Sequence, residues 1–212
     1  MPFAMLEALP VPVVLVPGLT CSPRLYAEQI PALWRFGPVT VADHRRDDSV
    51  AAIARRISAS APPRFRSLAC RWAVTSLLRS CGKRPERVAK LALLDTGARG
   101  ETPEQTERRK VVVALAKAGR YAEVADIAFP IYVHRNRHQD ETLKRVVRAM
   151  AEDTGVEAFL RQQQAIMSRP DSRPRSGRSD AQRWFSSAMT IRPRHPIFRV
   201  RSPPAFPERD WS

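Results

Sequence analysis

Cysteine and glycine are scarce in this chain of 212 residues, with three and eight copies, and no long apolar run is present. The three cysteines, Cys21, Cys70 and Cys81, are odd in number and lack the spacing of zinc ligands, so they indicate neither a disulfide framework nor a metal site. The apolar run at residues 11–16 is too short to span a membrane and lacks the basic lead-in of a secretory signal. These features favour a protein of the reducing cytoplasm without a membrane anchor.

Acidic residues are also in short supply, since 21 of them face 36 Lys and Arg and leave a net charge of +15. Such an excess usually indicates a polyanionic partner. Here it is concentrated in residues 64–84, with six basic residues and no acid, and in residues 169–212, with ten Arg and four acids. The tryptophans Trp72, Trp184 and Trp211 do not interleave regularly with the arginines. We therefore do not expect nucleic acid as a partner, although a basic nucleic-acid-binding protein stays open as an alternative.

Strands and helices alternate in the first half of the chain. Strands are expected at residues 11–18, 37–43 and 87–96, and helices at residues 22–34 and 49–58. The strand segments are β-branched or apolar and end in turn residues, while Ser22 and either Asp48 or Ser49 are suited to cap the two helices. Alternation at this spacing predicts βαβ units and a parallel sheet.

The second half is helical and then irregular. Helices are expected at residues 102–119, 140–155 and 156–167. A helical block inserted after a strand of a parallel sheet is typical of a lid over the ligand-binding edge. The remainder is rich in Arg, Ser and Pro without any period, which predicts a disordered tail. The predicted division is a core at residues 1–98, a helical lid at residues 99–168 and a basic tail at residues 169–212.

This layout resembles the α/β-hydrolase superfamily, in its small esterase- and lactonase-like branch. The resemblance rests on the order of "VVLVPGLT", "VTVADHRRDDS", "SVAAIARRI", "PERVAKLALLDTGA" and the helical block, and it covers residues 9–66 and 85–168. It implies an α/β fold with an incomplete hydrolase sheet, a small ester or lactone as the substrate of an intact member, and neither metal nor organic cofactor. It also implies that the turn at Gly18 and Leu19 supplies the oxyanion hole through the Leu19 N–H.

The serine motif of that family, Gly-x-Ser-x-Gly, is missing. Its counterpart is "LACRWAVTSL", residues 68–77, where Cys70 and Arg71 replace the serine beside residues unsuited to the tight turn. A shifted reading frame accounts for the loss. When the last base of each codon joins the first two of the next, Trp72 followed by Ala73 forces a glycine. The segment can then encode G-L-S-M-G-G-Y-V-A, with its serine across the joint of Cys70 and Arg71.

The tail gives a second match in the same frame. From Asp180 it can encode C-P-T-L-V-L-V-G-D-D-D-P, a buried strand followed by the acidic turn that the family uses for its triad acid. We therefore hypothesise frame changes at residues 67–84 and 175–212, which also explain the excess of arginine. No catalytic residue is then intact, and we expect a hydrolase relative without activity. A diverged domain with basic insertions and a non-catalytic binding module on the same fold remain alternatives.

A few other residues are candidates with simpler interpretations. His44 could line the mouth of a pocket or be an ordinary loop histidine, and Asp95 could supply the acid or cap a turn. The resemblance places the catalytic base after a final strand, beyond the last residue given, and His195 in the tail is expected to be a solvated residue. Seven apolar residues could line an acyl pocket or pack helices together: Val111, Val112, Leu115, Val124, Ile127, Phe129 and Leu160.

The arginines around residues 67–70 predict a folding problem. A central strand of a parallel sheet must be apolar on both faces. Arg64, Arg66 and Arg71 flank the only apolar piece available there, and an unpaired buried guanidinium costs several kcal/mol. We therefore expect this strand to be damaged and the chain to be marginally stable.

Overall fold

The computed structural model describes residues 10–70, 85–94, 100–169, 171 and 189–191. The β-strands are β1 (Val13–Val16), β2 (Val39–Val41), β3 (Phe65–Cys70), β4 (Val88–Leu94) and β5 (Met189–Ile191). The α-helices are α1 (Ile30–Leu33), α2 (Val50–Ser60), α4 (Pro103–Lys117), α5 (Tyr121–Tyr132), α6 (Glu141–Thr154) and α7 (Val156–Met167). Short 3₁₀ helices are η1 (Pro23–Tyr26), η2 (Trp34–Phe36), η3 (Pro85–Arg87) and η4 (Arg135–Arg137).

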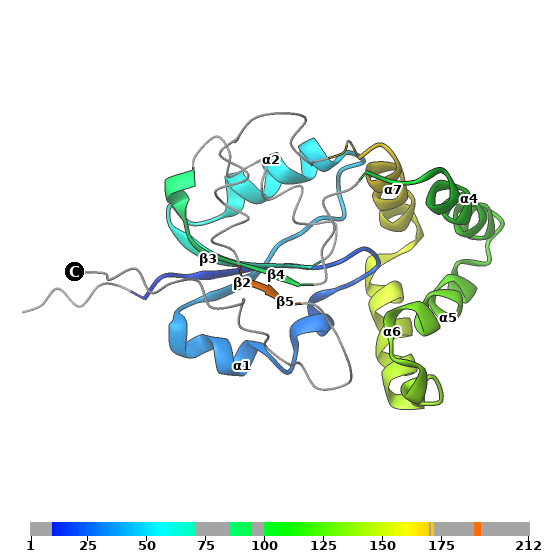
Figure 1. Ribbon diagram of the computed structural model, residues 1–212, viewed down its shortest axis with the longest axis horizontal. Helices are drawn as coiled ribbons and strands as arrows, with labels where there is room; N and C mark the ends of the chain where they lie inside the picture. The colour runs from blue at the N-terminus through cyan, green and yellow to red at the C-terminus, as the bar shows by residue number, and fades with distance from the viewer. Residues whose placement is uncertain (1–9, 71–84, 95–99, 170, 172–188, 192–212) are drawn as a thin grey trace, which may run out of the picture.

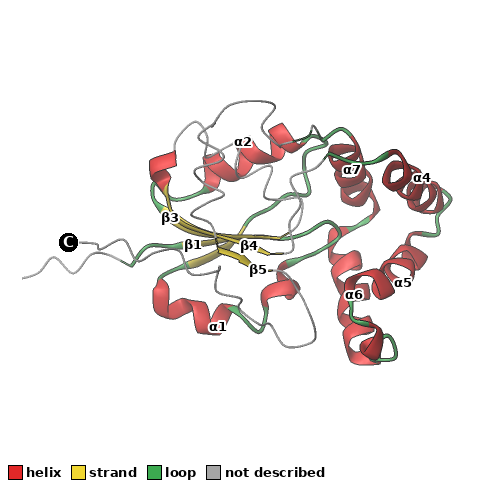
Figure 2. Cartoon of the chain, in the orientation of Figure 1, coloured by secondary structure: helices red, strands yellow, loops and turns green. Residues whose placement is uncertain are grey.

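The five strands form one parallel sheet in the order β2-β1-β3-β4-β5. Figure 1 shows α2 on one face of the sheet and α1 on the other, and Figure 2 shows the same layers coloured by element type. All four residues of β1 are buried, because this strand lies inside the sheet and helices cover both of its faces. The predicted parallel α/β sheet is therefore confirmed.

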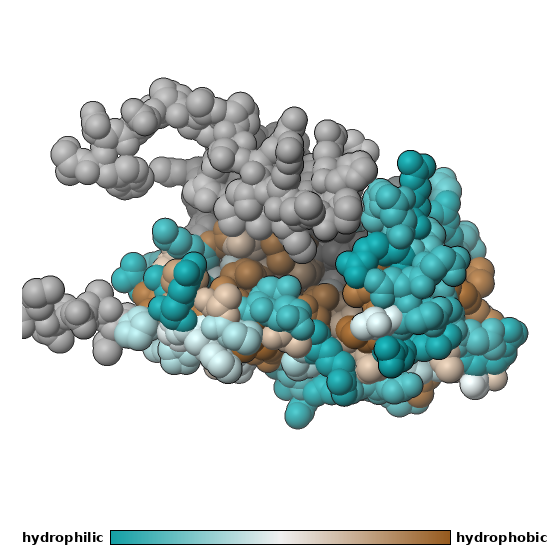
Figure 3. Space-filling view, turned by 90° about the horizontal axis from the view of Figure 1, so that it is seen from below, coloured by the Kyte–Doolittle hydropathy of each residue, from teal (hydrophilic) through white to brown (hydrophobic). Residues whose placement is uncertain are grey.

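The larger part of the core lies between the sheet and α2. Ile53 and Ile57 of α2 pack there with Val14, Val16 and other buried side chains of the strands. Of the two residues expected to cap α2, Asp48 and Ser49, it is Ser49 that accepts the hydrogen bond, from the backbone N–H of Ala52. Seen from below, on the side where Figure 1 places α1, the surface also shows hydrophobic patches (Figure 3).

The strand β3 forms in spite of its arginines. Phe65, Ser67 and Ala69 are buried, and the hydroxyl of Ser67 donates to the carbonyl of Val14. The half-buried Arg66 is paired, since its Nη1 donates to two backbone carbonyls, those of Val11 at 2.8 Å and Phe36 at 2.9 Å. The prediction that these arginines interrupt the strand is therefore wrong for residues 65–70. The remainder of the suspect segment, residues 71–84, lies outside the described residues.

The helix predicted at residues 22–34 is broken into η1, α1 and η2. Pro31 is the physical reason, because a proline inside a helix lacks the N–H for the backbone bond and its ring clashes with the carbonyl four residues earlier. The helix therefore starts anew at Ile30, with Pro31 in its first turn. Ser22 does accept the capping bond expected of it, from the N–H of Arg24, although at 3.4 Å.

Helices α4 to α7, residues 103–167, form what we call the helical segment. Thr102 and Gln105 make a capping box at the start of α4, and Gly119, with a φ of 78°, follows its end. Inside the segment, Val124 and Phe159 are buried against Leu115 and Leu160, so packing explains these apolar residues. Two others of the predicted pocket-lining set, Val111 and Ile127, lie at the surface and are 61% and 45% exposed.

The tail contributes one short strand. Met189–Ile191 pairs in parallel with Ala92–Leu94 of β4. The expectation of a tail without structure is therefore wrong for these three residues, whereas residues 172–188 and 192–212 lie outside the described part of the chain. None of the described helices is long and apolar enough to cross a membrane.

Candidate functional site

The candidate site is the turn that follows β1, at residues 17–22. Because all strands are parallel, their carboxyl ends share one edge of the sheet, and Figure 1 shows the helical segment gathered beside that edge. Hydrogen bonds from this turn to α6 and α7 hold the two parts together. In open parallel sheets, ligands bind at this edge.

His44 fixes the first peptide unit of the turn. Its Nε2 lies 3.0 Å from the carbonyl oxygen of Gly18, and a carbonyl only accepts, so Nε2 donates. The side chain is 2% exposed, and burial lowers the pKa of His44, which keeps the imidazole neutral. In a trans peptide the C=O and N–H point in opposite directions. The bond to Gly18 therefore turns the Leu19 N–H away from His44.

The next peptide unit is fixed by Gln162 of α7. The N–H of Thr20 donates to Gln162 Oε1 at 2.9 Å, a contact between residues 142 positions apart in the sequence. Thr20 has a φ of 58°, a left-handed conformation that is uncommon outside glycine. The turn is thus held in an unfavourable backbone conformation by a buried hydrogen bond. Leu19 lies between these two anchors, and no described residue accepts a hydrogen bond from its N–H.

Charged residues beside the turn connect it to the helical segment. Asp153 of α6 accepts hydrogen bonds from the Ser22 hydroxyl at 2.7 Å and from Arg24 Nε at 2.7 Å. The hydrogen bonds from Arg24 and Ser22 lower the pKa of Asp153. The side chain of Arg45, from the loop after β2, donates a hydrogen bond to the backbone carbonyl of Asp153. The backbone carbonyl of Arg45 accepts one from Arg161 Nε. These contacts attach the helical segment to the core beside residues 18–20.

Cys70 is the last residue of β3 and stands at the edge where the resemblance places the nucleophile. The hydroxyl of Tyr26 donates to the carbonyl of Val16 at 2.8 Å and lies 3.3 Å from Cys70 Sγ. Burial, and then the neighbouring Cys70, raise the pKa of Tyr26, so the phenol stays protonated and cannot activate the thiol as a base. Arg71, Asp95 and His195 lie outside the described residues.

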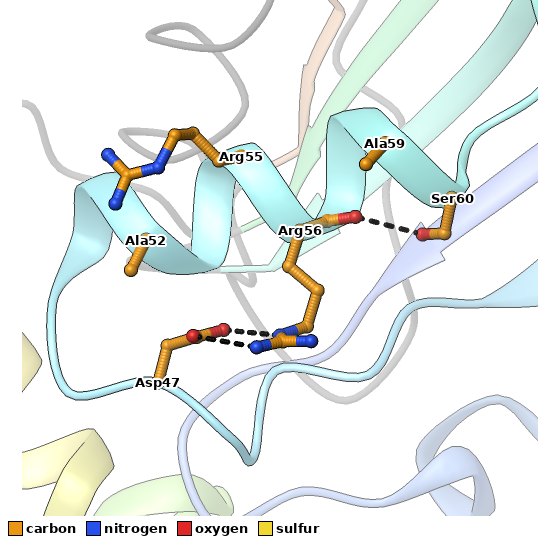
Figure 4. Close-up of a pocket in the computed structure, with 6 residues that line it drawn as sticks. All are labelled: Asp47, Ala52, Arg55, Arg56, Ala59 and Ser60. Carbon is orange, nitrogen blue, oxygen red and sulfur yellow. Dashed lines mark hydrogen bonds and ion pairs between the residues drawn. The ribbon is translucent and has the colours of Figure 1, made fainter.

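No metal site is found in the described part of the chain, where no group of three or more His, Cys, Asp and Glu could hold an ion. One surface hollow, about 560 Å³, lies on α2 (Figure 4). Two of its charged residues are paired with each other, because Asp47 accepts from Arg56 Nε at 2.6 Å, and the Ser60 hydroxyl donates to the Arg56 carbonyl. We assign no function to this hollow.

The sequence interpretation found Gly18, Leu19 and His44 but missed Gln162 and Asp153. A signal for Gln162 was present, because the helix at 156–167 has an apolar stripe that Gln162 and Gln163 interrupt, and both are buried. Asp153 carried no such signal, since its partner Ser22 is 131 positions away in the sequence.

Comparison with known proteins identifies the fold. The structure is similar to the enol-lactonase of Burkholderia xenovorans, with a TM-score of 0.67, 16% identity, and coverage of 79% of this chain and 68% of the lactonase. It is also similar to a thermophilic esterase of Thermogutta terrifontis, with a TM-score of 0.66, 19% identity, and coverage of 77% and 66%. The chain has the α/β-hydrolase fold.

The α/β-hydrolase fold is also seen at greater sequence distance. A carboxylesterase structure from Nitrososphaera gargenis gives a TM-score of 0.63 at 12% identity and covers 88% of this chain and 72% of its own. No protein-family model matches the chain, and no curated protein does either. The chain thus spans about two thirds of the length of the structures it resembles, and at these identities the likeness concerns the fold.

Proposed function

We propose that this chain derives from a serine hydrolase of small esters or lactones and that it does not turn over such substrates as written. The observation that carries the ancestry is the turn at Gly18–Thr20. Its middle N–H is offered at the ligand-binding edge of the sheet, while His44 and Gln162 hold the flanking peptide groups. An N–H fixed in this way, in a partly buried turn, is what stabilises the oxyanion of an acyl-transfer reaction.

The proposed lack of turnover follows from the residues at the end of β3. Acyl transfer needs a nucleophile, a base and an acid that orients the base. Cys70 and Arg71 occupy the place of the serine, and Tyr26 beside Cys70 is not a base. In this proposal residues 99–168 act as the lid, residues 1–98 form the core, and the frame changes at residues 67–84 and 175–212 removed the triad.

Two versions of the protein test the proposal. Sequencing the coding DNA comes first, because the hypothesis requires codons at Cys70 and Arg71 that spell serine across their joint. The chain as written and a frame-corrected chain are then assayed with p-nitrophenyl butyrate and with γ-butyrolactone. We expect background rates from the first and turnover from the second, since the oxyanion hole and binding alone give little rate without the triad.

A Cys70→Ala variant of the chain as written is the control. We expect it to be indistinguishable from its parent. If the parent turns over ester and Cys70→Ala abolishes the activity, the thiol is a nucleophile and the chain is an active hydrolase. If the frame-corrected chain is folded but inactive on both substrates, the proposed ancestry loses its support.

A further inference from the structure

Gln162 has a fully buried side chain, 0% exposed, whose two polar atoms differ in their hydrogen bonding. Its Oε1 accepts the hydrogen bond from the Thr20 N–H. Because a backbone N–H can only donate, its partner must be the amide oxygen, and the amide orientation is settled by chemistry. The other end, Nε2, carries two N–H donors.

The Nε2 of Gln162 is buried and has no hydrogen-bond partner among the described residues. A buried donor left unpaired costs free energy, so such groups are normally satisfied by protein, water or ligand. The adjacent Gln163 shows the ordinary case, because Arg109 Nη1 donates to its Oε1 at 3.1 Å and ties α7 to α4. The unpaired amide of Gln162 instead stands at the turn that carries the Leu19 N–H.

We propose that Gln162 Nε2 is a ligand-binding group that donates a hydrogen bond to a carbonyl or carboxylate oxygen of a small molecule held at this turn. Thr20 aligns the amide by holding its oxygen, so the donor is presented without loss of side-chain freedom on binding. The carboxylate of Asp153, which is bonded to the same turn, is already engaged by Ser22 and Arg24, so it does not compete for this donor. The ligand class rests on the proposed function.

The proposal gives α7 a specific part in binding. Gln162 belongs to the helical segment, while Leu19 and Thr20 belong to the turn after β1. An oxygen bound by donors from both would connect the helical segment to the core at the ligand itself. A bound molecule would then protect α7 as well as the turn from hydrogen exchange.

The test uses the full chain labelled with ¹⁵N-glutamine and butyrate as the probe. We expect butyrate to shift the side-chain NH₂ signals of Gln162, with n-butylamine, which lacks an acceptor oxygen, leaving them unchanged. Gln162→Glu is the informative variant. Its carboxylate can still accept from Thr20 and, at a pH where it is ionised, offers no donor, so we expect butyrate to bind on the order of tenfold more weakly or worse.

Gln163→Glu is the matched control, because it changes the neighbouring buried glutamine and keeps an acceptor for Arg109. We expect it to bind butyrate within about twofold of the parent. Equal butyrate affinity in Gln162→Glu and Gln163→Glu would overturn the proposal. So would Gln162 NH₂ signals that exchange magnetisation with a bound water and ignore up to 50 mM butyrate, since a structural water would then be the partner. This last measurement needs only the parent chain and stands even if Gln162→Glu does not fold.

The test of the Gln162 site and the test of the proposed function can fail independently. Butyrate binding is measured without turnover, whereas the ancestry is tested by hydrolysis in the frame-corrected chain. Loss of binding in Gln162→Glu together with an inactive corrected chain would keep the ligand site and remove the hydrolase. Turnover in the corrected chain with no effect of Gln162→Glu on KM or kcat would support the hydrolase ancestry and remove the ligand site.

Discussion

His44 Nε2 donates to the Gly18 carbonyl across 3.0 Å, and this bond joins the loop after β2 to the turn after β1. The contact sets the direction of the Gly18–Leu19 peptide, which is the proposed oxyanion donor. It also places a titratable group in the interior, where burial lowers the pKa of His44. The stability of the fold is therefore coupled to pH.

The first prediction concerns that coupling. The unfolded state binds the proton of His44 at pH values below about 6.5, whereas the folded state binds it only at a lower pH. The unfolded state thus carries more protons in this interval, and the free energy of unfolding falls as the pH drops below about 6.5. Urea unfolding at pH 7.5 and at pH 5.5 should show the loss.

A His44→Gln variant provides the control for this prediction. Its side-chain amide can still donate to the Gly18 carbonyl but does not titrate. We expect the variant to unfold at about the same urea concentration at both pH values. An equal pH dependence in His44→Gln and in the parent would show that other groups cause it.

The second prediction tests the Tyr26 hydroxyl. Tyr26→Phe removes the hydrogen bond from the buried hydroxyl to the Val16 carbonyl at the end of β1. We expect the free energy of unfolding to drop by about 1 kcal/mol. Tyr132→Phe, in a tyrosine that is 41% exposed, should change it by about 0.5 kcal/mol or less. Denaturant titration compares the two, and equal effects would mean that the buried hydroxyl contributes nothing specific.

The sequence predicted those parts of the fold that local patterns determine. The strand expected at residues 11–18 is found as Val13–Val16, and Ser49, one of two residues expected to cap the next long helix, caps it; both features depend on neighbours close in the sequence. The contact of Thr20 with Gln162 could not be predicted in the same way. It depends on how the helical segment meets the sheet, which only the tertiary structure defines.

Arg66 is a second residue whose tertiary contacts could not be predicted from the sequence. Composition alone marked it as a buried charge without a partner, because its partners are backbone carbonyls that no pattern reveals. In the structure its guanidinium reaches two such carbonyls and lies 5.7 Å from the centre of the Phe36 ring. An arginine that is harmful in an isolated strand is thus accommodated by backbone carbonyls just before β1 and at the end of η2.

The third prediction follows from these contacts. Arg66→Ala removes the hydrogen bonds to the Val11 and Phe36 carbonyls, and we expect the free energy of unfolding to fall by about 1–2 kcal/mol. Arg64→Ala, two positions earlier and exposed, is the matched control and should cost about 0.5 kcal/mol or less. Thermal melts of both variants decide the point. A rise in stability in Arg66→Ala would restore the view that this arginine damages the strand.

The fourth prediction concerns the attachment of the helical segment at Asp153. Its carboxylate accepts from Arg24 and Ser22, and these bonds lower its pKa, the one from Arg24 having the larger effect. The stabilisation is present at neutral pH and is lost as the pH falls below about 4, where the carboxyl becomes protonated first in the unfolded state. Because Asp153 is partly exposed, we expect Asp153→Ala to cost only about 1 kcal/mol at pH 7.

The useful readout for Asp153→Ala is local as well as global. Hydrogen exchange in the turn at residues 18–22 should become faster, because the turn loses its link to α6, while α2 on the far side of the core should keep its protection. Glu152→Ala, the exposed neighbour in α6, is the control and should leave both regions unchanged. Faster exchange throughout the sheet in Asp153→Ala would contradict a local role. That result would mean that the helical segment and the core unfold as one cooperative unit, with Asp153 stabilising the whole of it.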